Sequence, residues 1–260
     1  MSDPVTSSDG TQIHYESTGS GAPALVFVHG WLGNVRWWDA QRDHFAARHQ
    51  VVTIDLAGHG CSGKTRTDWS IARYGDDVRA VLDRIAAPEV VLVGHSMSGP
   101  NVVAAAAGRR EVVGIVLVDT MKNLDRAMPI EQANQIMAMY RSDFPRAVND
   151  LLPQYLYSPS TPPEVRARLQ REFLATPAEF AVTAIEPLYK SDLAALAAAI
   201  RVPVRNIVGD LEPVDTEVNR KHFGDYDVLR LPAVGHYPML EKPAEFNAAL
   251  EDALRASGRS

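Results

Sequence analysis

Residues 90–99 of the chain read Val90-Val91-Leu92-Val93-Gly94-His95-Ser96-Met97-Ser98-Gly99. Four apolar residues stop at Gly94, and a helix-compatible stretch, Val102–Ala107, follows Gly99. The apolar run is typical of a strand that is buried on both faces, as in a parallel sheet. A sharp turn from this strand into a helix would push the hydroxyl group of Ser96 out of the sheet, at the positive end of the helix. The same pattern also fits an ordinary turn whose serine caps the helix.

This turn departs slightly from the five-residue pattern Gly-x-Ser-x-Gly that presents a nucleophilic serine. Ser98 stands where the second glycine is expected, and Gly99 comes one place late. Because serine is also small, the strand and the helix can still approach each other closely. We therefore expect Ser96 to be exposed at the turn and available as a nucleophile.

Length and composition restrict the class of protein. The 260 residues suit one large α/β domain or two small ones, and 46% of them are hydrophobic, enough for a sizeable core. The net charge of −6 does not favour binding to nucleic acid or to an anionic membrane. No apolar run approaches the roughly 20 residues of a membrane helix, and the polar stretch Met1–Gly10 is unlike a secretion signal. The single cysteine, Cys61, excludes an internal disulfide, so we expect a cytoplasmic protein.

Strands and helices are predicted to alternate along most of the chain. Ser8-Asp9-Gly10 predicts a hairpin turn between Val5–Ser7 and Gln12–Glu16. Apolar runs predict buried strands at Ala24–Val28, Val51–Asp55, Val112–Val118, Val204–Val208 and Tyr226–Leu231. Helical patterns occur at Trp37–Ala47, Ile71–Ala87, Thr216–Phe223 and Ala244–Ala256. Such alternation indicates parallel β-α-β units.

The alternation stops between Met121 and about Lys190, where helical segments are separated by prolines and are rich in methionine and aromatic residues. We predict that residues 121–190 form a helical cap insertion, and that residues 1–120 and 191–260 form the core domain. The cap would lie over the carboxyl edge of the sheet, where ligands bind in such folds. Methionine and aromatic side chains also serve as plain packing, so this interval alone does not identify a binding surface.

The chain resembles the α/β-hydrolase superfamily over nearly its whole length. The resemblance rests on His29-Gly30-Trp31, Asp55-x-x-Gly58-His59-Gly60-x-Ser62, the Ser96 turn, and Gly235-His236 followed by Glu241-Lys242-Pro243. It implies an α/β fold with a mostly parallel eight-stranded sheet flanked by helices, and a cap-bearing serine esterase or lactonase. In that family the nucleophile, the acid and the histidine follow one another along the chain. The resemblance therefore makes Ser96 the nucleophile and His236 the base.

The acid that orients His236 has two candidates. Many relatives place it three residues after a glycine that follows the strand before the histidine, and Glu212 has that position after Gly209. Other relatives take it from the end of the preceding strand, where Asp119 stands. We leave both open at this point; Asp210 is closer to its strand end but is out of the usual spacing.

The resemblance also implies an oxyanion hole formed by the backbone N–H groups of Trp31 and Met97. His95 is adjacent to the nucleophile and cannot reach its hydroxyl group from a tight turn, so we assign it a packing role. His29 and His59 are expected to shape loops. No histidine pair has the spacing of a metal site, and we expect neither a metal nor a cofactor.

We therefore predict a cofactor-free serine hydrolase that acts on a small-molecule ester or lactone through an acyl-enzyme intermediate. Alternatives on the same fold are carbon–carbon bond hydrolysis and a perhydrolase or haloperoxidase-like activity. A small-lactone-binding receptor and a pseudoenzyme that binds other proteins are alternatives of a different class. The serine at position 96 argues against a dehalogenase or an epoxide hydrolase, whose relatives use aspartate at this place.

Overall fold

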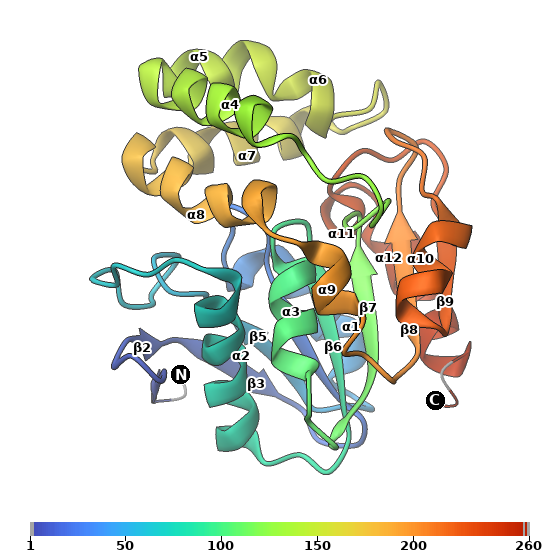
Figure 1. Cartoon of the computed structure of the whole chain (residues 1–260). Helices are drawn as coiled ribbons and strands as arrows, with labels where there is room; N and C mark the ends of the chain where they lie inside the picture. The colour runs from blue at the N-terminus through green and yellow to red at the C-terminus, as the bar shows by residue number, and fades with distance from the viewer. Residues whose placement is uncertain (1–2, 257, 259–260) are drawn as a thin grey trace.

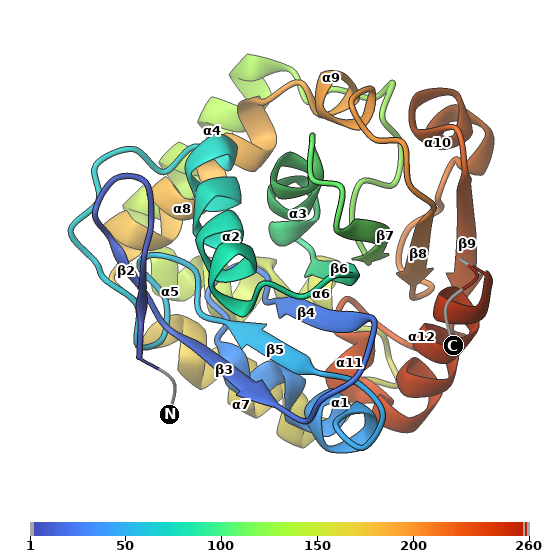
Figure 2. The ribbon, with the colours of Figure 1, turned by 90° about the horizontal axis from the view of Figure 1, so that it is seen from below.

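A seven-stranded sheet forms the centre of the computed structural model, which describes residues 3–256 and 258 (Figures 1 and 2). The remaining residues, at the ends of the expected core segments 1–120 and 191–260, lie outside the described part. The strand order is β3 (Tyr15–Thr18), β5 (Val51–Ile54), β4 (Ala24–Val28), β6 (Val90–His95), β7 (Val112–Val118), β8 (Val204–Val208) and β9 (Tyr226–Arg230). Only β3 is antiparallel to its neighbour in this sheet, which confirms the predicted mostly parallel arrangement.

Within the described residues, the main sheet has one strand fewer than the eight that the resemblance implied. β1 (Val5–Thr6) and β2 (Gln12–Ile13) instead form a separate antiparallel pair. The predicted strand Gln12–Glu16 is interrupted at His14, because Ile13 pairs with Val5 whereas Tyr15 pairs with Ile54. The hairpin therefore stays outside the main sheet.

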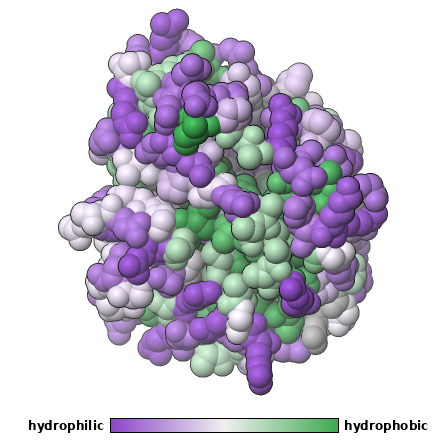
Figure 3. Space-filling model, in the orientation of Figure 1, coloured by the Kyte–Doolittle hydropathy of each residue, from purple (hydrophilic) through white to green (hydrophobic). Residues whose placement is uncertain are grey.

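Helices cover both faces of the sheet, which explains why its strands are continuous apolar runs. α2 (Ile71–Ile85), α3 (Ser98–Ala106) and α9 (Leu193–Ala197) lie on one face, and α1 (Asp39–Phe45), α11 (Pro238–Glu241) and α12 (Pro243–Ala256) lie on the other (Figure 2). A 3-10 turn, η1 (Val35–Trp38), precedes α1, and α10 (Thr216–Phe223) packs against β9. Apolar surface gathers over α9 and α3 on the face drawn in Figure 3. Among the described helices, none combines the length and the apolar character needed to cross a membrane.

A layer of helices lies between β7 and β8 in the chain and above the carboxyl ends of the strands in space (Figure 1). It consists of α4 (Ile130–Ser142), α5 (Phe144–Arg146), the π-helical turn η2 (Ala147–Leu151), α6 (Pro153–Leu156), α7 (Pro163–Leu174) and α8 (Ala178–Lys190), and we call it the α4–α8 layer. Two indole N–H groups hold it to the core. Trp31 Nε1 donates to the carbonyl of Ala181, and Trp37 Nε1 donates to Glu172, each at 2.7 Å.

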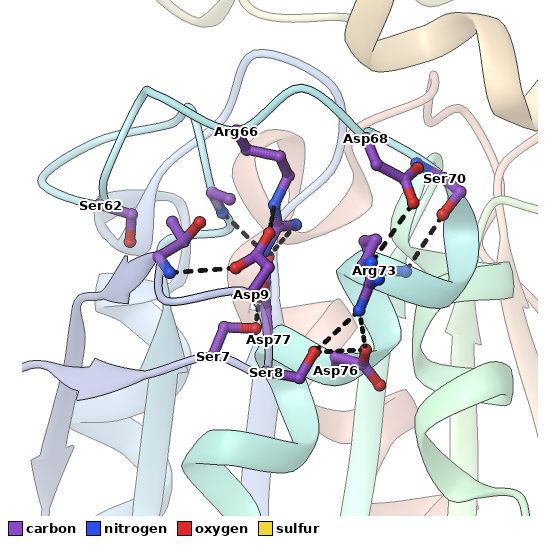
Figure 4. Close-up of polar contacts among 12 residues, drawn as sticks. Ser7, Ser8, Asp9, Ser62, Arg66, Asp68, Ser70, Arg73, Asp76 and Asp77 are labelled. Carbon is purple, nitrogen blue, oxygen red and sulfur yellow. Dashed lines mark hydrogen bonds and ion pairs between the residues drawn. The ribbon is translucent and has the colours of Figure 1, made fainter.

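A buried ion-pair network ties the N-terminal hairpin to α2 (Figure 4). Arg66 lies in the loop before α2, and its guanidinium group contacts Asp77 of α2 and Asp9 of the hairpin. The side chains of Arg66 and Asp77 are both fully buried. Ser7 Oγ donates to the Asp77 carboxylate at 2.7 Å, so the hairpin is joined to α2 directly as well.

Candidate active site

Ser96 occupies a sharp turn between β6 and α3. Its φ of 51° lies in the left-handed region, which is uncommon for a residue other than glycine and is typical of strained functional positions. Two hydrogen bonds hold this backbone: Ser96 N donates to Val118 O at 2.9 Å, and Thr120 Oγ1 donates to Ser96 O at 2.7 Å. The structure thus contains the strand, sharp turn and helix that the sequence predicts.

Small residues around Ser96 let the helix approach the strand. A Cβ atom added at Gly94 would lie 2.6 Å from a methyl carbon of Val102, and one added at Gly99 would lie 2.4 Å from the methyl carbon of Thr120. Ser98, which replaces the expected glycine, is buried, and its hydroxyl group donates to the backbone carbonyl of His29. The departure from the glycine pattern is therefore accommodated by one additional hydrogen bond.

His236 lies between Ser96 and Asp119. It follows β9 in the loop before α11, and its Nε2 atom is 2.8 Å from Ser96 Oγ. Its Nδ1 atom is 2.6 Å from Oδ2 of Asp119, which directly follows β7 and has a side chain only 1% exposed. An ionised carboxylate only accepts hydrogen bonds, so Nδ1 carries the proton. The lone pair of Nε2 is then free to accept the Ser96 hydroxyl proton.

The other candidate acids lie elsewhere. Glu212 Oε2 is 3.5 Å from Lys122 Nζ, and the Glu212 side chain is 65% exposed. Asp210 accepts a hydrogen bond from the backbone N–H of Ala233 at 2.5 Å and so closes the turn. Of the carboxylates considered from the sequence, the structure brings Asp119 to His236, and it brings neither Glu212 nor Asp210 there.

The surroundings of Asp119 favour its ionised form. Burial alone would raise the pKa of Asp119, but the hydrogen bond and positive charge of His236, together with Lys122, more than offset it and hold the pKa well below its usual range. Lys122 Nζ lies 3.1 Å from Oδ2, and the backbone N–H of Gly209 donates to Oδ1 at 3.2 Å. The Asp119 carboxylate is therefore ionised, and it accepts hydrogen bonds from His236, Lys122 and Gly209.

His95 does more than the packing that the sequence suggested. Its Nε2–H donates to the backbone carbonyl of His236 at 2.8 Å, and the centroids of the two rings are 4.9 Å apart. Burial, reinforced by the nearby His236, lowers the pKa of His95 to about 3, so it stays neutral and holds the backbone of His236 by a hydrogen bond. Nothing in the sequence distinguishes this contact from simple burial.

His29 and His59 fix the loops that follow β4 and β5. His29 Nδ1–H donates to Gly30 O at 2.7 Å, and its Nε2 accepts from the backbone N–H of Leu56 at 3.2 Å. His59 donates from Nδ1 to Ala57 O at 3.0 Å. Burial lowers the pKa of His29 to about 4 and that of His59 to about 3, so both are neutral near pH 7. These contacts agree with the loop-shaping role expected from the sequence.

A cavity of about 610 Å³ opens onto Ser96 and His236 from beneath the α4–α8 layer. Trp31 lines it beside Ser96. Its walls are mainly apolar and come from α4, η2, α6 and α8, with Ile136, Met139, Tyr140, Leu151, Leu156, Ile185 and Leu188 among the lining residues. The charged side chains Lys122, Arg126 and Glu212 also line it. The cavity can therefore accept a largely apolar molecule whose reacting group reaches Ser96.

One group of side chains away from this cavity has donors that could hold a metal ion. Single ligand atoms of His14, Asp55 and Cys61 lie within 4.8 Å of one another, a proximity that the sequence spacing did not suggest. Both oxygens of Asp55 already accept backbone hydrogen bonds, one from Val35 at 2.8 Å and one from Cys61 at 2.9 Å. The carboxylate thus serves to close the loop after β5.

Known proteins match both the sequence and the fold. A model of the Alpha/beta hydrolase family matches residues 25–249. The 3-oxoadipate enol-lactonase 2 of Acinetobacter baylyi is 25% identical over 261 residues, covering 97% of this chain and 96% of that protein. The solved structure of Est816, described as an N-acyl homoserine lactone degrading enzyme, is 28% identical, has a TM-score of 0.81 and covers 96% of this chain and 99% of its own. The bromoperoxidase of Bacillus anthracis superimposes with a TM-score of 0.85 over 98% of this chain and 100% of its own; at 19% identity it supports the fold alone. These matches confirm the fold expected from the sequence.

Proposed function

The chain belongs to the alpha/beta hydrolase family, and we propose that it is a serine hydrolase that cleaves a carboxylic ester or a lactone through an acyl-enzyme intermediate. The observation that carries the proposal is the unbroken contact from Ser96 through His236 to Asp119, at 2.8 and 2.6 Å, on the floor of the apolar cavity. A nucleophile, a base and an orienting carboxylate in hydrogen-bond contact are the arrangement that activates a serine.

The first half of the reaction acylates Ser96. Its Oγ forms a bond to the substrate carbonyl carbon while its proton moves to His236 Nε2, and the carbonyl oxygen becomes an oxyanion. When the tetrahedral intermediate collapses, the bond to the alcohol oxygen breaks and that oxygen takes the proton from Nε2. In a lactone the alcohol oxygen remains attached to the acyl group as a hydroxyl.

The second half releases the acid. Water attacks the acyl carbon and gives a proton to His236, and collapse of the second intermediate returns that proton to Ser96 Oγ. Asp119 remains ionised throughout and stabilises the imidazolium that forms twice in the cycle. The whole cycle uses groups of this chain and consumes one water molecule.

We assign the oxyanion to the backbone N–H groups of Trp31 and Met97. Met97 is the N-cap residue of α3, so its N–H has no acceptor within the helix and lies at the positive end of the helix dipole. Trp31 follows Gly30 in the loop after β4, and both Trp31 and Ser96 line the cavity. Removing one such donor typically costs about 3–4 kcal/mol of transition-state stabilisation.

We further propose that residues 121–190 act as a cap that selects the substrate. The apolar walls contributed by the α4–α8 layer favour a substrate with a nonpolar acyl or alcohol part. The names of two relatives, an enol-lactonase and an N-acyl homoserine lactone degrading enzyme, support including lactones among the substrates.

Labelling with an alkyl fluorophosphonate tests the proposal without knowledge of the substrate. We expect one equivalent to attach to Ser96, no labelling of Ser96→Ala, and full labelling of the control Ser98→Ala. p-Nitrophenyl esters and acyl lactones of graded chain length would then rank the substrates by kcat/KM. Labelling of the Ser96→Ala protein at the level of the unchanged protein would contradict the proposal. Hydrolysis that stops after one equivalent of lactone, without further turnover, would contradict it as well.

A further inference from the structure

One oxygen of Asp119 contacts two side-chain nitrogens, of which one belongs to a lysine ammonium group. Oδ2 is 2.6 Å from His236 Nδ1 and 3.1 Å from Lys122 Nζ. The Lys122 side chain is 14% exposed, so solvent screens this pair only in part. Because both contacts use the same oxygen, Lys122 competes with His236 for the charge of the carboxylate.

A second carboxylate lies on the far side of the lysine. Glu212 Oε2 is 3.5 Å from Lys122 Nζ, and its side chain is 65% exposed. The charges therefore alternate along Glu212, Lys122 and Asp119, and the row continues through the imidazole of His236 to the hydroxyl group of Ser96. Lys122 and Asp119 come from the loop after β7, whereas Glu212 comes from the loop after β8. Packing of the two loops is what assembles this row.

This inference rests on the proposed function. We propose that Lys122 is a positioning residue that extends catalysis to lower pH, because it withdraws part of the Asp119 charge from His236. The imidazole can accept the Ser96 proton only while it is neutral, and a full negative charge beside it would favour the imidazolium form. The positive charge of Lys122 offsets part of the negative charge of Asp119 and so disfavours the imidazolium form. Glu212 in turn offsets part of the Lys122 charge and weakens its influence on His236.

The groups that contact His236 from other elements are mostly uncharged. His95 of β6 contacts the backbone carbonyl of His236 and is neutral, since burial lowers its pKa to about 3. The backbone N–H of His236 donates to Leu156 O of α6, and the ring packs against that of Tyr237 at 5.1 Å. Glu241 of α11 is buried and accepts hydrogen bonds from the backbone N–H groups of Gly235 and Tyr237, on either side of His236, at 2.9 and 3.0 Å; the substitutions proposed below leave it unchanged. The remaining charged side chains that line the cavity, besides Asp119 and Lys122, are Arg126 and Glu212.

Substitutions at Lys122 and Glu212 should move the pH dependence in opposite directions. In Lys122→Met no lysine offsets the Asp119 charge, so His236 should become easier to protonate. The pH at which the reaction rate of Ser96 falls on the acid side, the acid limb of its pH profile, should then be higher by about one unit. Glu212→Gln leaves Lys122 less neutralised, so the limb should move to lower pH, by about a few tenths of a unit because Glu212 is exposed. Lys122→Arg retains the cation and should restore a profile close to that of the unchanged protein.

The experiment measures the rate at which a neutral alkyl fluorophosphonate inactivates the full chain between about pH 5 and about pH 9. Lys190→Met is the matched control, because Lys190 forms an ion pair with Glu186 at 2.5 Å in α8 and does not line the cavity. Circular dichroism and thermal unfolding verify that each variant is folded. If the unchanged protein is not labelled at Ser96, the proposed function fails. The other outcome is that Ser96 is labelled but the acid limb lies at the same pH in the unchanged protein, in Lys122→Met and in Glu212→Gln. That result overturns the role of Lys122.

Discussion

Ser96 and Asp119 directly follow two neighbouring parallel strands and have nearly the same positive φ, 51° and 50°. The register of β6 and β7 pairs His95 with Val118, so the residue after each lies at the same level of the sheet. Both backbones are held there, since Ser96 N donates to Val118 O and Asp119 N donates to Ile207 O, each at 2.9 Å. Ser96 and Asp119 therefore reach His236 from adjacent strands.

This geometry predicts that Asp119 orients the imidazole. Asp119→Asn should lower kcat/KM by roughly ten-thousand-fold, because an amide can donate to Nδ1 and so favour the wrong tautomer; that magnitude is the one known for the corresponding change in a serine protease triad. Glu212→Gln should retain most of the activity at neutral pH. Steady-state kinetics of both single variants and the double variant on one ester would test the assignment. A severe Glu212→Gln and a mild Asp119→Asn would reverse it.

The sequence could not choose between these carboxylates for a topological reason. β7 and β8 both lie between the nucleophile strand β6 and β9, the strand before the histidine. Both carboxylates follow strands whose carboxyl ends meet at the same edge, so either could reach His236. Which carboxylate contacts His236 depends on the path of the loop that carries it. The number of residues between positions in the sequence does not determine that path.

The fold was easier to predict because apolar runs report burial directly. The run at Val90–Val93 is a central strand, and the runs at Ala24–Val28 and Val112–Val118 are its neighbours. The eight-strand expectation was wrong in detail because the segment Gln12–Glu16 changes its pairing partner at His14, which leaves the hairpin outside the main sheet. The contact of Lys122 with Asp119 was missed altogether, since a lysine three residues after an aspartate is an ordinary surface pattern until that aspartate is known to contact His236.

A separate prediction concerns the buried pair that anchors the hairpin (Figure 4). Arg66→Met should destabilise the protein by about 3–5 kcal/mol, because it leaves the Asp77 carboxylate buried without its cation. Equilibrium urea unfolding, followed by fluorescence, measures the loss.

Arg73→Met provides the matched control for that measurement. Arg73 lies 3.3 Å from both Asp68 and Asp76 but is 39% exposed, so its loss should cost less than about 1 kcal/mol. If the two substitutions lowered the free energy of unfolding equally, burial would not be what determines the contribution of the Arg66–Asp77 pair to stability.

The buried neutral histidines predict how stability depends on pH. Burial lowers the pKa of His29 to about 4 and the pKa values of His59 and His95 to about 3, against about 6.5 in an unfolded chain. Above pH 6.5 both states are neutral and the three groups have no effect. Below it the unfolded state binds protons that the folded state cannot, so the free energy of unfolding should fall, by roughly 1.4 kcal/mol per histidine at about pH 5.5. Urea unfolding at a series of pH values between neutrality and about pH 5 measures this slope.

His59→Gln isolates one of these groups, because glutamine does not titrate. His59 packs against Phe180, with ring centroids 5.1 Å apart, and lies outside the Ser96 contacts. The substitution should reduce the slope by about one third, whatever its effect on stability at neutral pH. A free energy of unfolding that stays constant from pH 7.5 to 5 in the unchanged protein would contradict the prediction.

The last prediction concerns backbone strain at the nucleophile. Ser96 has a positive φ, where a Cβ atom costs about 1–2 kcal/mol and glycine costs nothing, whereas Ser98 begins α3, where glycine is less favourable than alanine by roughly 0.5–1 kcal/mol. Both substitutions at Ser96 remove the hydroxyl group, and both substitutions at Ser98 remove the hydrogen bond to His29, so each comparison isolates the backbone. Ser96→Gly should therefore be more stable than Ser96→Ala, and Ser98→Gly less stable than Ser98→Ala, when all four are unfolded in urea. A Ser96→Ala protein at least as stable as Ser96→Gly would show that the turn stores no strain at Ser96.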